Sequence, residues 1–91
     1  MPNVDVKQAV KAATEFLSDV IQDSRSRSAL LEEVELSEDG SEWFVTISVP
    51  APSSNSLAAA MSALQVDPRD YRIIRVNAVN GLVSSMKIRK L

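Results

Sequence analysis

The chain has 91 residues, of which 45% are hydrophobic and 24% are charged, and its formal net charge at pH 7 is −2. This length and composition predict one folded domain and exclude wholesale disorder. Cysteine and histidine are both absent, which excludes disulfides and thiolate sites and removes the commonest zinc ligands and the commonest general base.

The charges are divided unevenly along the chain. Residues 1–50 carry four basic and ten acidic side chains, whereas residues 51–91 carry six basic and two acidic ones. Such a division is compatible with a solvated surface, with attraction between the two halves or with a docking surface.

The amino-terminal run MPNVDVKQAVKAATEF mixes acidic with apolar side chains, unlike a secretory signal. No later stretch approaches the roughly 20 apolar residues that a membrane span requires. We therefore expect a cytoplasmic protein, although a chain whose leader had been removed would show the same pattern.

The first predicted element is an amphipathic helix from about Val6 to Gln22. Its apolar residues recur at steps of three and four, the spacing of one helical stripe. Asp5 is a suitable N-cap, and Gln8 three residues later completes a variant of the capping box. The stripe, which must pack on another apolar surface, consists of Val6, Ala9, Val10, Ala13, Phe16, Leu17, Val20 and Ile21.

Two strand-like runs follow the polar segment DSRSRS, and a turn at Asp39-Gly40 joins them. In the first run apolar residues alternate with Glu33 and Glu35, and in the second they alternate with Phe44, Thr46 and Ser48. Such alternation on both sides of a glycine turn is typical of a β-hairpin. The apolar set consists of Leu30, Val34, Leu36, Trp43, Val45, Ile47 and Val49.

The next segment, residues 50–69, is interpreted as an insertion between two hairpins. Pro50 and Pro52 are expected to stop the preceding strand, because proline has no donor for the ladder. A helical spacing of apolar residues favours a short helix near Asn55–Gln65, and the alternative is a mobile crossover rich in Ala and Ser. The apolar residues with this spacing are Leu57, Ala60, Met61 and Leu64.

The last part of the chain predicts a second hairpin. Its strands are Tyr71–Ala78 and Leu82–Arg89, and Asn80-Gly81 is suited to the positive φ values of a tight turn. The order of helix, hairpin, short helix and hairpin predicts an α+β fold. In this fold the amino-terminal helix packs on one face of a four-stranded antiparallel sheet.

The runs KQAVKAATEFL, LLEEVELSEDGSEWFVTISV and YRIIRVNAVNGLVSSMKI resemble the PepSY domain and its PepSY-like relatives. There an amphipathic helix precedes a hairpin, and the last hairpin carries a V-D-A-x-x-G-x-V signature. Residues 76–83 fit this signature, with Asn77 in place of the usual Asp. The resemblance implies a single domain over residues 1–91 and a non-enzymatic module that inhibits or regulates a partner. Cystatin-like domains share the architecture, and architecture alone does not define function.

One face of the predicted sheet is left uncovered by the helix. Its residues are rich in aromatic and basic side chains and short of acids, which is typical of the centre of an interface. We predict that this face binds another protein, a peptide segment or a second copy of the chain. The alternatives are that residues 50–69 cover it with Leu57, Met61 and Leu64, or that an edge strand binds the partner. Alternation assigns to the predicted binding surface Phe44, Thr46, Tyr71, Ile73, Arg75, Val83, Lys87 and Arg89, with Ser48 and Ser85 on the same face.

No catalytic, metal or cofactor site is expected. The acidic residues between Glu32 and Glu42 lie on a solvent-facing strand side or in a turn, and no nucleophile–base pair accompanies them. The run ELSEDGSE lacks the spacing of a calcium loop, and both glycines lie in turns rather than in a phosphate-binding loop.

Nucleic-acid binding by the carboxyl-terminal hairpin is the alternative function. Tyr71 lies among the basic residues there, as a stacking platform would require. The acidic net charge opposes this alternative, and so do the opposite directions of Arg72 and Arg75 along their strand. The basic residues are Arg69, Arg72, Arg75, Lys87, Arg89 and Lys90.

Overall fold

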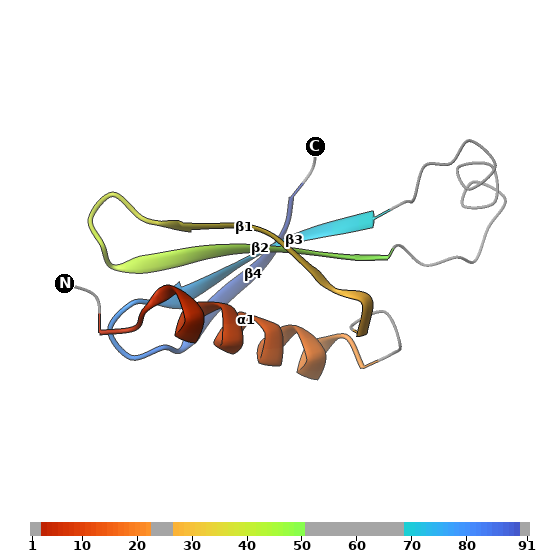
Figure 1. Cartoon of the computed structure of the whole chain (residues 1–91), viewed down its shortest axis with the longest axis horizontal. Coiled ribbons are helices and arrows are strands. Elements are labelled where there is room, and N and C mark those ends of the chain that lie inside the picture. The colour runs from red at the N-terminus through yellow and green to blue at the C-terminus, as the bar shows by residue number, and fades with distance from the viewer. Residues whose placement is uncertain (1–2, 23–26, 51–68, 90–91) are drawn as a thin grey trace, which may run out of the picture.

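The structure is a computed structural model, and it describes residues 3–22, 27–50 and 69–89. The helix α1 lies along one face of a twisted antiparallel sheet whose strand order is β1-β2-β3-β4 (Figure 1). The predicted fold class is therefore confirmed. The short helix expected near Asn55–Gln65 lies outside the described residues, as does the cover by Leu57, Met61 and Leu64. The elements are α1 (Val6–Val20), β1 (Leu30–Leu36), β2 (Glu42–Pro50), β3 (Arg69–Asn77) and β4 (Val83–Arg89).

Helix α1 begins with the expected capping box. The Asp5 side chain accepts from the Gln8 backbone N–H, and the Gln8 side chain accepts from the Asp5 backbone N–H, both at 2.8 Å. The helix ends at Val20, two residues earlier than predicted, because Ile21 adopts an extended backbone (φ −97°, ψ 90°). Within the described residues, no helix is long and apolar enough to cross a membrane.

The core lies between α1 and the facing side chains of the sheet. Ala9 and Ala13 are fully buried on α1, and their small side chains let the helix lie close to the strands. On the sheet, Val45, Ile74 and Val76 are also fully buried, and Trp43 packs against this cluster as a partly buried residue. The rows of cross-strand neighbours facing α1 are Leu36–Trp43–Val76–Val83, Val34–Val45–Ile74–Met86 and Leu31–Ile47–Arg72–Ile88.

Two β-bulges decide which side chains face α1. In β1, Leu31 lies opposite Ile47 and Glu33 opposite Thr46, so Glu32 is the extra residue. An extra residue reverses the alternation beyond it. For this reason Leu31, rather than the predicted Leu30, shares the α1 side with Val34.

The second bulge corrects one of the predicted binding residues. In β4, Ser85 lies opposite Arg75 and Val83 opposite Val76, which makes Ser84 the extra residue. Val83 therefore packs against the core under α1. Its assignment to the uncovered face is wrong, because strict alternation does not hold across a bulge.

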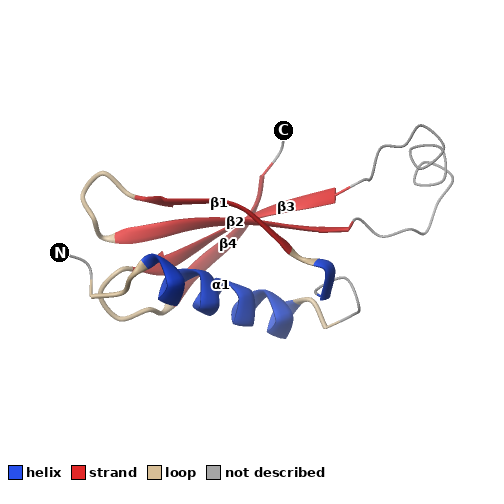
Figure 2. Ribbon diagram, viewed as in Figure 1, coloured by secondary structure: helices blue, strands red, loops and turns tan. Residues whose placement is uncertain are grey.

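Both hairpin turns lie at the end of the sheet where α1 begins (Figure 2). Gly81 has a φ of +75° in the second turn, a conformation that favours glycine. The segment before α1 is held there by hydrogen bonds from Val4 N–H to the Ala78 carbonyl (2.9 Å) and from the Trp43 indole N–H to the Val4 carbonyl (2.8 Å). These contacts connect the start of the helix with both hairpins.

Candidate functional site

The candidate site is the face of the sheet opposite α1, which we call the open face. No helix or strand within the described ranges lies on it (Figure 1). Its rows of cross-strand neighbours are Glu35–Phe44–Arg75–Ser85, Glu33–Thr46–Ile73–Lys87 and Leu30–Ser48–Tyr71–Arg89.

Seven of the eight predicted binding residues lie together on the open face, and Val83 is the exception. Six of the seven line a hollow of about 410 Å³, while Tyr71 lies beyond the hollow, between Ser48 and Arg89. The hollow is lined by Phe44, Thr46, Ile73, Arg75, Lys87 and Arg89, together with Glu33 and Glu35 from β1.

The hollow has an acidic side and a basic side. Glu33 and Glu35 line it from β1, whereas Lys87 and Arg89 line it from β4 at the opposite edge of the sheet. The expectation that this face is short of acids is therefore wrong. The alternation of the two glutamates with Val34 was the signal for their position, since residues two apart in a strand share a face.

An ion pair crosses the open face from one edge of the sheet to the other. Arg89 Nη1 on β4 lies 2.9 Å from Glu33 Oε2 on β1. Three inter-strand spacings, or about 14 Å in a flat sheet, separate these strands. Both long side chains must therefore extend inward over the face to meet.

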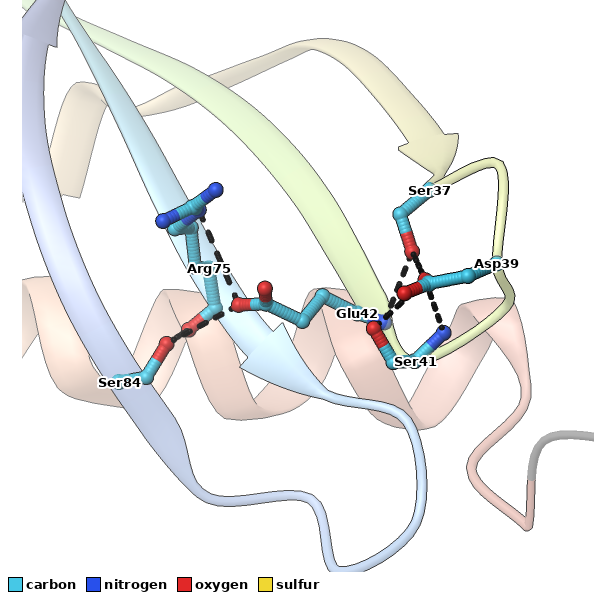
Figure 3. A network of polar contacts seen from close by, with 6 residues as sticks. All are labelled: Ser37, Asp39, Ser41, Glu42, Arg75 and Ser84. Atoms are coloured by element: carbon cyan, nitrogen blue, oxygen red, sulfur yellow. Dashed lines mark hydrogen bonds and ion pairs between the residues drawn. The ribbon is translucent and has the colours of Figure 1, made fainter.

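A second set of contacts holds Arg75 in place (Figure 3). Its guanidinium carbon lies 5.2 Å from the centroid of the Phe44 ring, within the range of a cation–π interaction. Its Nε lies 3.7 Å from Glu42 Oε2, and the Ser84 hydroxyl donates to the same carboxylate oxygen at 3.3 Å. Arg75 is therefore oriented by an aromatic ring and a carboxylate on β2.

A network of hydrogen bonds surrounds the buried Ser48 at the end of the open face away from the two hairpin turns. The Ser48 hydroxyl donates to Glu32 Oε2 at 2.6 Å and accepts from Arg69 Nε at 2.8 Å. Arg69 also donates to the carbonyls of Ser28 (2.8 Å) and Ser48 (3.1 Å). These bonds join β1, β2 and β3 and satisfy the polar groups that burial would otherwise leave unpaired.

The turn between β1 and β2 contains an aspartate with a perturbed pKa. The Ser41 hydroxyl and backbone N–H donate to Asp39 Oδ1 at 2.6 and 3.0 Å, and the Ser37 hydroxyl donates to it at 2.8 Å (Figure 3). These bonds, chiefly those from Ser41, lower the pKa of Asp39 from 3.8 to about 2. Asp39 is therefore a weak base that organises its own turn. The described residues contain no cluster of three acidic side chains suited to a metal ion.

Two charged side chains of the hollow make no polar contact with another described residue. Among the described residues, Lys87 and Glu35 make no side-chain hydrogen bond or ion pair, in contrast to Arg89 and Arg75. A ligand that carries both a negative and a positive charge could therefore contact Lys87 and Glu35 at the same time.

Comparison of the chain with protein-family models, with curated proteins and with solved structures finds no significant match.

Proposed function

We propose that this chain is a non-enzymatic protein-binding module whose open face holds a segment of a partner protein, in a regulatory, inhibitory or scaffolding role. The observation that carries the proposal is the hollow of about 410 Å³, which has Phe44 and Ile73 in its lining. On its two sides lie Glu35 and Lys87, neither of which has a partner in the described part of the chain. Such a hollow is within the size range of ligand pockets, and Arg and aromatic side chains are enriched at interface centres.

The chemistry of the hollow defines the segment that would fit it. An apolar side chain would contact Phe44 and Ile73, a carboxylate would reach Lys87, and a cationic group would reach Glu35. The ion pair between Glu33 and Arg89 spans the hollow. The segment would therefore lie beside this pair or displace it.

The same geometry disfavours nucleic acid as the partner. Arg75 and Arg89 are each paired with a glutamate on the open face, and Arg72 lies on the α1 side, 3.9 Å from Asp70. Arg69 is engaged by Ser48 and Ser28. Carboxylates beside most of these cations would repel a phosphate backbone.

The PepSY-like resemblance is compatible with this proposal. Asn77, which departs from the signature, accepts from the backbone N–H groups of Val79 (2.8 Å) and Asn80 (3.1 Å) through its side-chain oxygen. An aspartate in that position would offer an oxygen acceptor as well. The order of one helix and two antiparallel hairpins is that of the PepSY-like and cystatin-like architectures.

A selection from a displayed library of random linear peptides tests the proposal. Peptides enriched on the wild-type chain should bind at least tenfold more weakly to Ile73→Ser and to Lys87→Ser. The control is Leu82→Ser, because Leu82 is 67% exposed and lies in the turn before β4, outside the open face. Enriched peptides that bind both open-face variants as tightly as the wild type would overturn the proposal.

A further inference from the structure

The sheet has two unpaired edges within the described residues. β1 pairs only with β2, and β4 pairs only with β3, and each edge strand is seven residues long. An edge strand offers backbone N–H and C=O groups to another strand. The side chains around each edge determine which strand fits.

The β1 edge combines an apolar groove on one face with acids on the other. A groove of about 400 Å³ lies between α1 and β1, lined by Val6, Lys7, Val10, Lys11, Leu31 and Val34. Leu31 is 52% exposed in it. On the open face the same strand carries Glu33 and Glu35. A strand that pairs here needs apolar side chains toward the groove and basic ones toward the open face.

The β4 edge has that pattern. Met86 and Ile88 lie on the α1 side, and Ile88 is 67% exposed. Lys87 and Arg89 lie on the open face, and Lys87 has no partner among the described residues. The sequence Met86-Lys87-Ile88-Arg89 therefore places apolar side chains on the α1 side and basic side chains on the open face, as the β1 edge requires.

We propose that β4 of one copy of this chain pairs antiparallel with β1 of a second copy, so that the two sheets form one continuous sheet. Strand direction alternates from β1 to β4, so a second copy in the same orientation places its β1 antiparallel to β4, with both helices on one side. In the register that aligns the faces, Ile88 lies beside Leu31 of the second copy, and Lys87 lies beside Glu33 of the second copy.

Charge disfavours the two alternative edge pairings. Two β1 edges together would bring Glu33 and Glu35 next to their own copies, and two β4 edges would do the same with Lys87 and Arg89. Like charges directly opposite each other destabilise a strand pair. The favoured contact is therefore head-to-tail, with β4 of one copy against β1 of the next. In a pair of copies, each copy keeps one unused edge that can bind a further copy.

This self-association goes beyond the proposed function, because backbone pairing between the β1 and β4 edges holds the two copies together, although Lys87 and Glu33 also line the hollow. Two substitutions of exposed residues test the two edges separately. Leu31→Ser removes the apolar side chain of the β1 edge, and Ile88→Ser removes that of the β4 edge. Both side chains are more than half exposed, so folding should persist, which far-UV circular dichroism checks. Leu82→Ser, in the turn and as exposed as Ile88, is the control.

Sedimentation velocity over a concentration series up to about 1 mM, a range that detects weak contacts, measures the outcome. The mean mass of the wild type and of the control should rise with concentration. Each edge variant alone should need at least tenfold higher concentration for the same mass. The equimolar mixture of the two variants should recover association but stop at a heterodimer, because only one intact edge of each kind remains per pair.

Three outcomes would overturn the inference. They are a wild type that stays monomeric over the whole range, edge variants that associate like the wild type, and a mixture that behaves like the separate variants. A monomeric wild type that instead binds a displayed peptide with alternating apolar and basic residues would assign the β1 edge to a different partner.

Discussion

Arg89 and Glu33 form an ion pair of 2.9 Å that joins the two edge strands of the sheet over its open face. The two residues are 56 positions apart in the chain. They can pair only because β1 and β4 form the two edges of the same sheet and both side chains lie on its open face. Both residues line the hollow, together with Ile73 and Thr46. A partner segment on this face must accommodate or open this ion pair.

The first prediction concerns the strength of that pair. Arg89 and Glu33 are 39% and 50% exposed, so a double-mutant cycle with Arg89→Ala and Glu33→Ala should give a coupling of about 0.5 kcal/mol in the free energy of unfolding. The coupling should decrease in high salt. Urea denaturation of the four proteins measures it. A coupling above about 2 kcal/mol would mean that the pair is much less hydrated than its exposure indicates.

The second prediction uses two neighbouring isoleucines on opposite faces of β3. Ile74 is fully buried under α1, so Ile74→Ala should lower the free energy of unfolding by about 2–5 kcal/mol. Ile73→Ala, on the partly exposed open face, should cost about 1 kcal/mol. Chemical denaturation compares the two variants directly. Equal losses would contradict the assignment of the two faces.

The third prediction concerns the anchor between β2 and the segment before α1. Trp43→Phe removes the indole N–H that donates to the Val4 carbonyl. The free energy of unfolding should fall by about 1–2 kcal/mol, because a hydrogen bond and some packing are lost. Amide hydrogen exchange should also accelerate at Val4, whose N–H bonds the Ala78 carbonyl. Unchanged exchange at Val4 would show that the indole does not hold this segment.

The fourth prediction is a dependence of stability on acid pH. The pKa of Asp39 is lowered to about 2 in the folded chain and returns to its ordinary value of 3.8 on unfolding. The stabilisation by the ionised carboxylate is therefore complete above about pH 4 and is lost as the pH falls through 2. Asp39→Asn should be less stable than the wild type at pH 7, and the difference should shrink between pH 4 and pH 2. A constant difference over that range, measured by urea denaturation, would rule out this linkage.

Local sequence signals were sufficient for the elements of the fold. The three- and four-residue spacing from Val6 onward and the capping box of Asp5 and Gln8 predicted α1, since both depend on contacts within a few residues. Glycines at positions 40 and 81 marked the two turns in the same way. Seven of the eight predicted binding residues lie on the open face for an equally local reason, the period of two in a strand.

The positions of the β-bulges and the order of the strands in the sheet depend on the tertiary structure. The bulges at Glu32 and Ser84 moved Leu31 and Val83 to the α1 side, because the register adjusts to the pairing with the adjacent strand and leaves no local sequence mark. The acidic side of the hollow and the pair between Glu33 and Arg89 depend on the strand order, which places β1 and β4 at the two edges of one sheet. The amino-acid sequence by itself determined the helix, the hairpins and most of the faces. Contacts between distant residues decided how charges and apolar side chains combine into a surface.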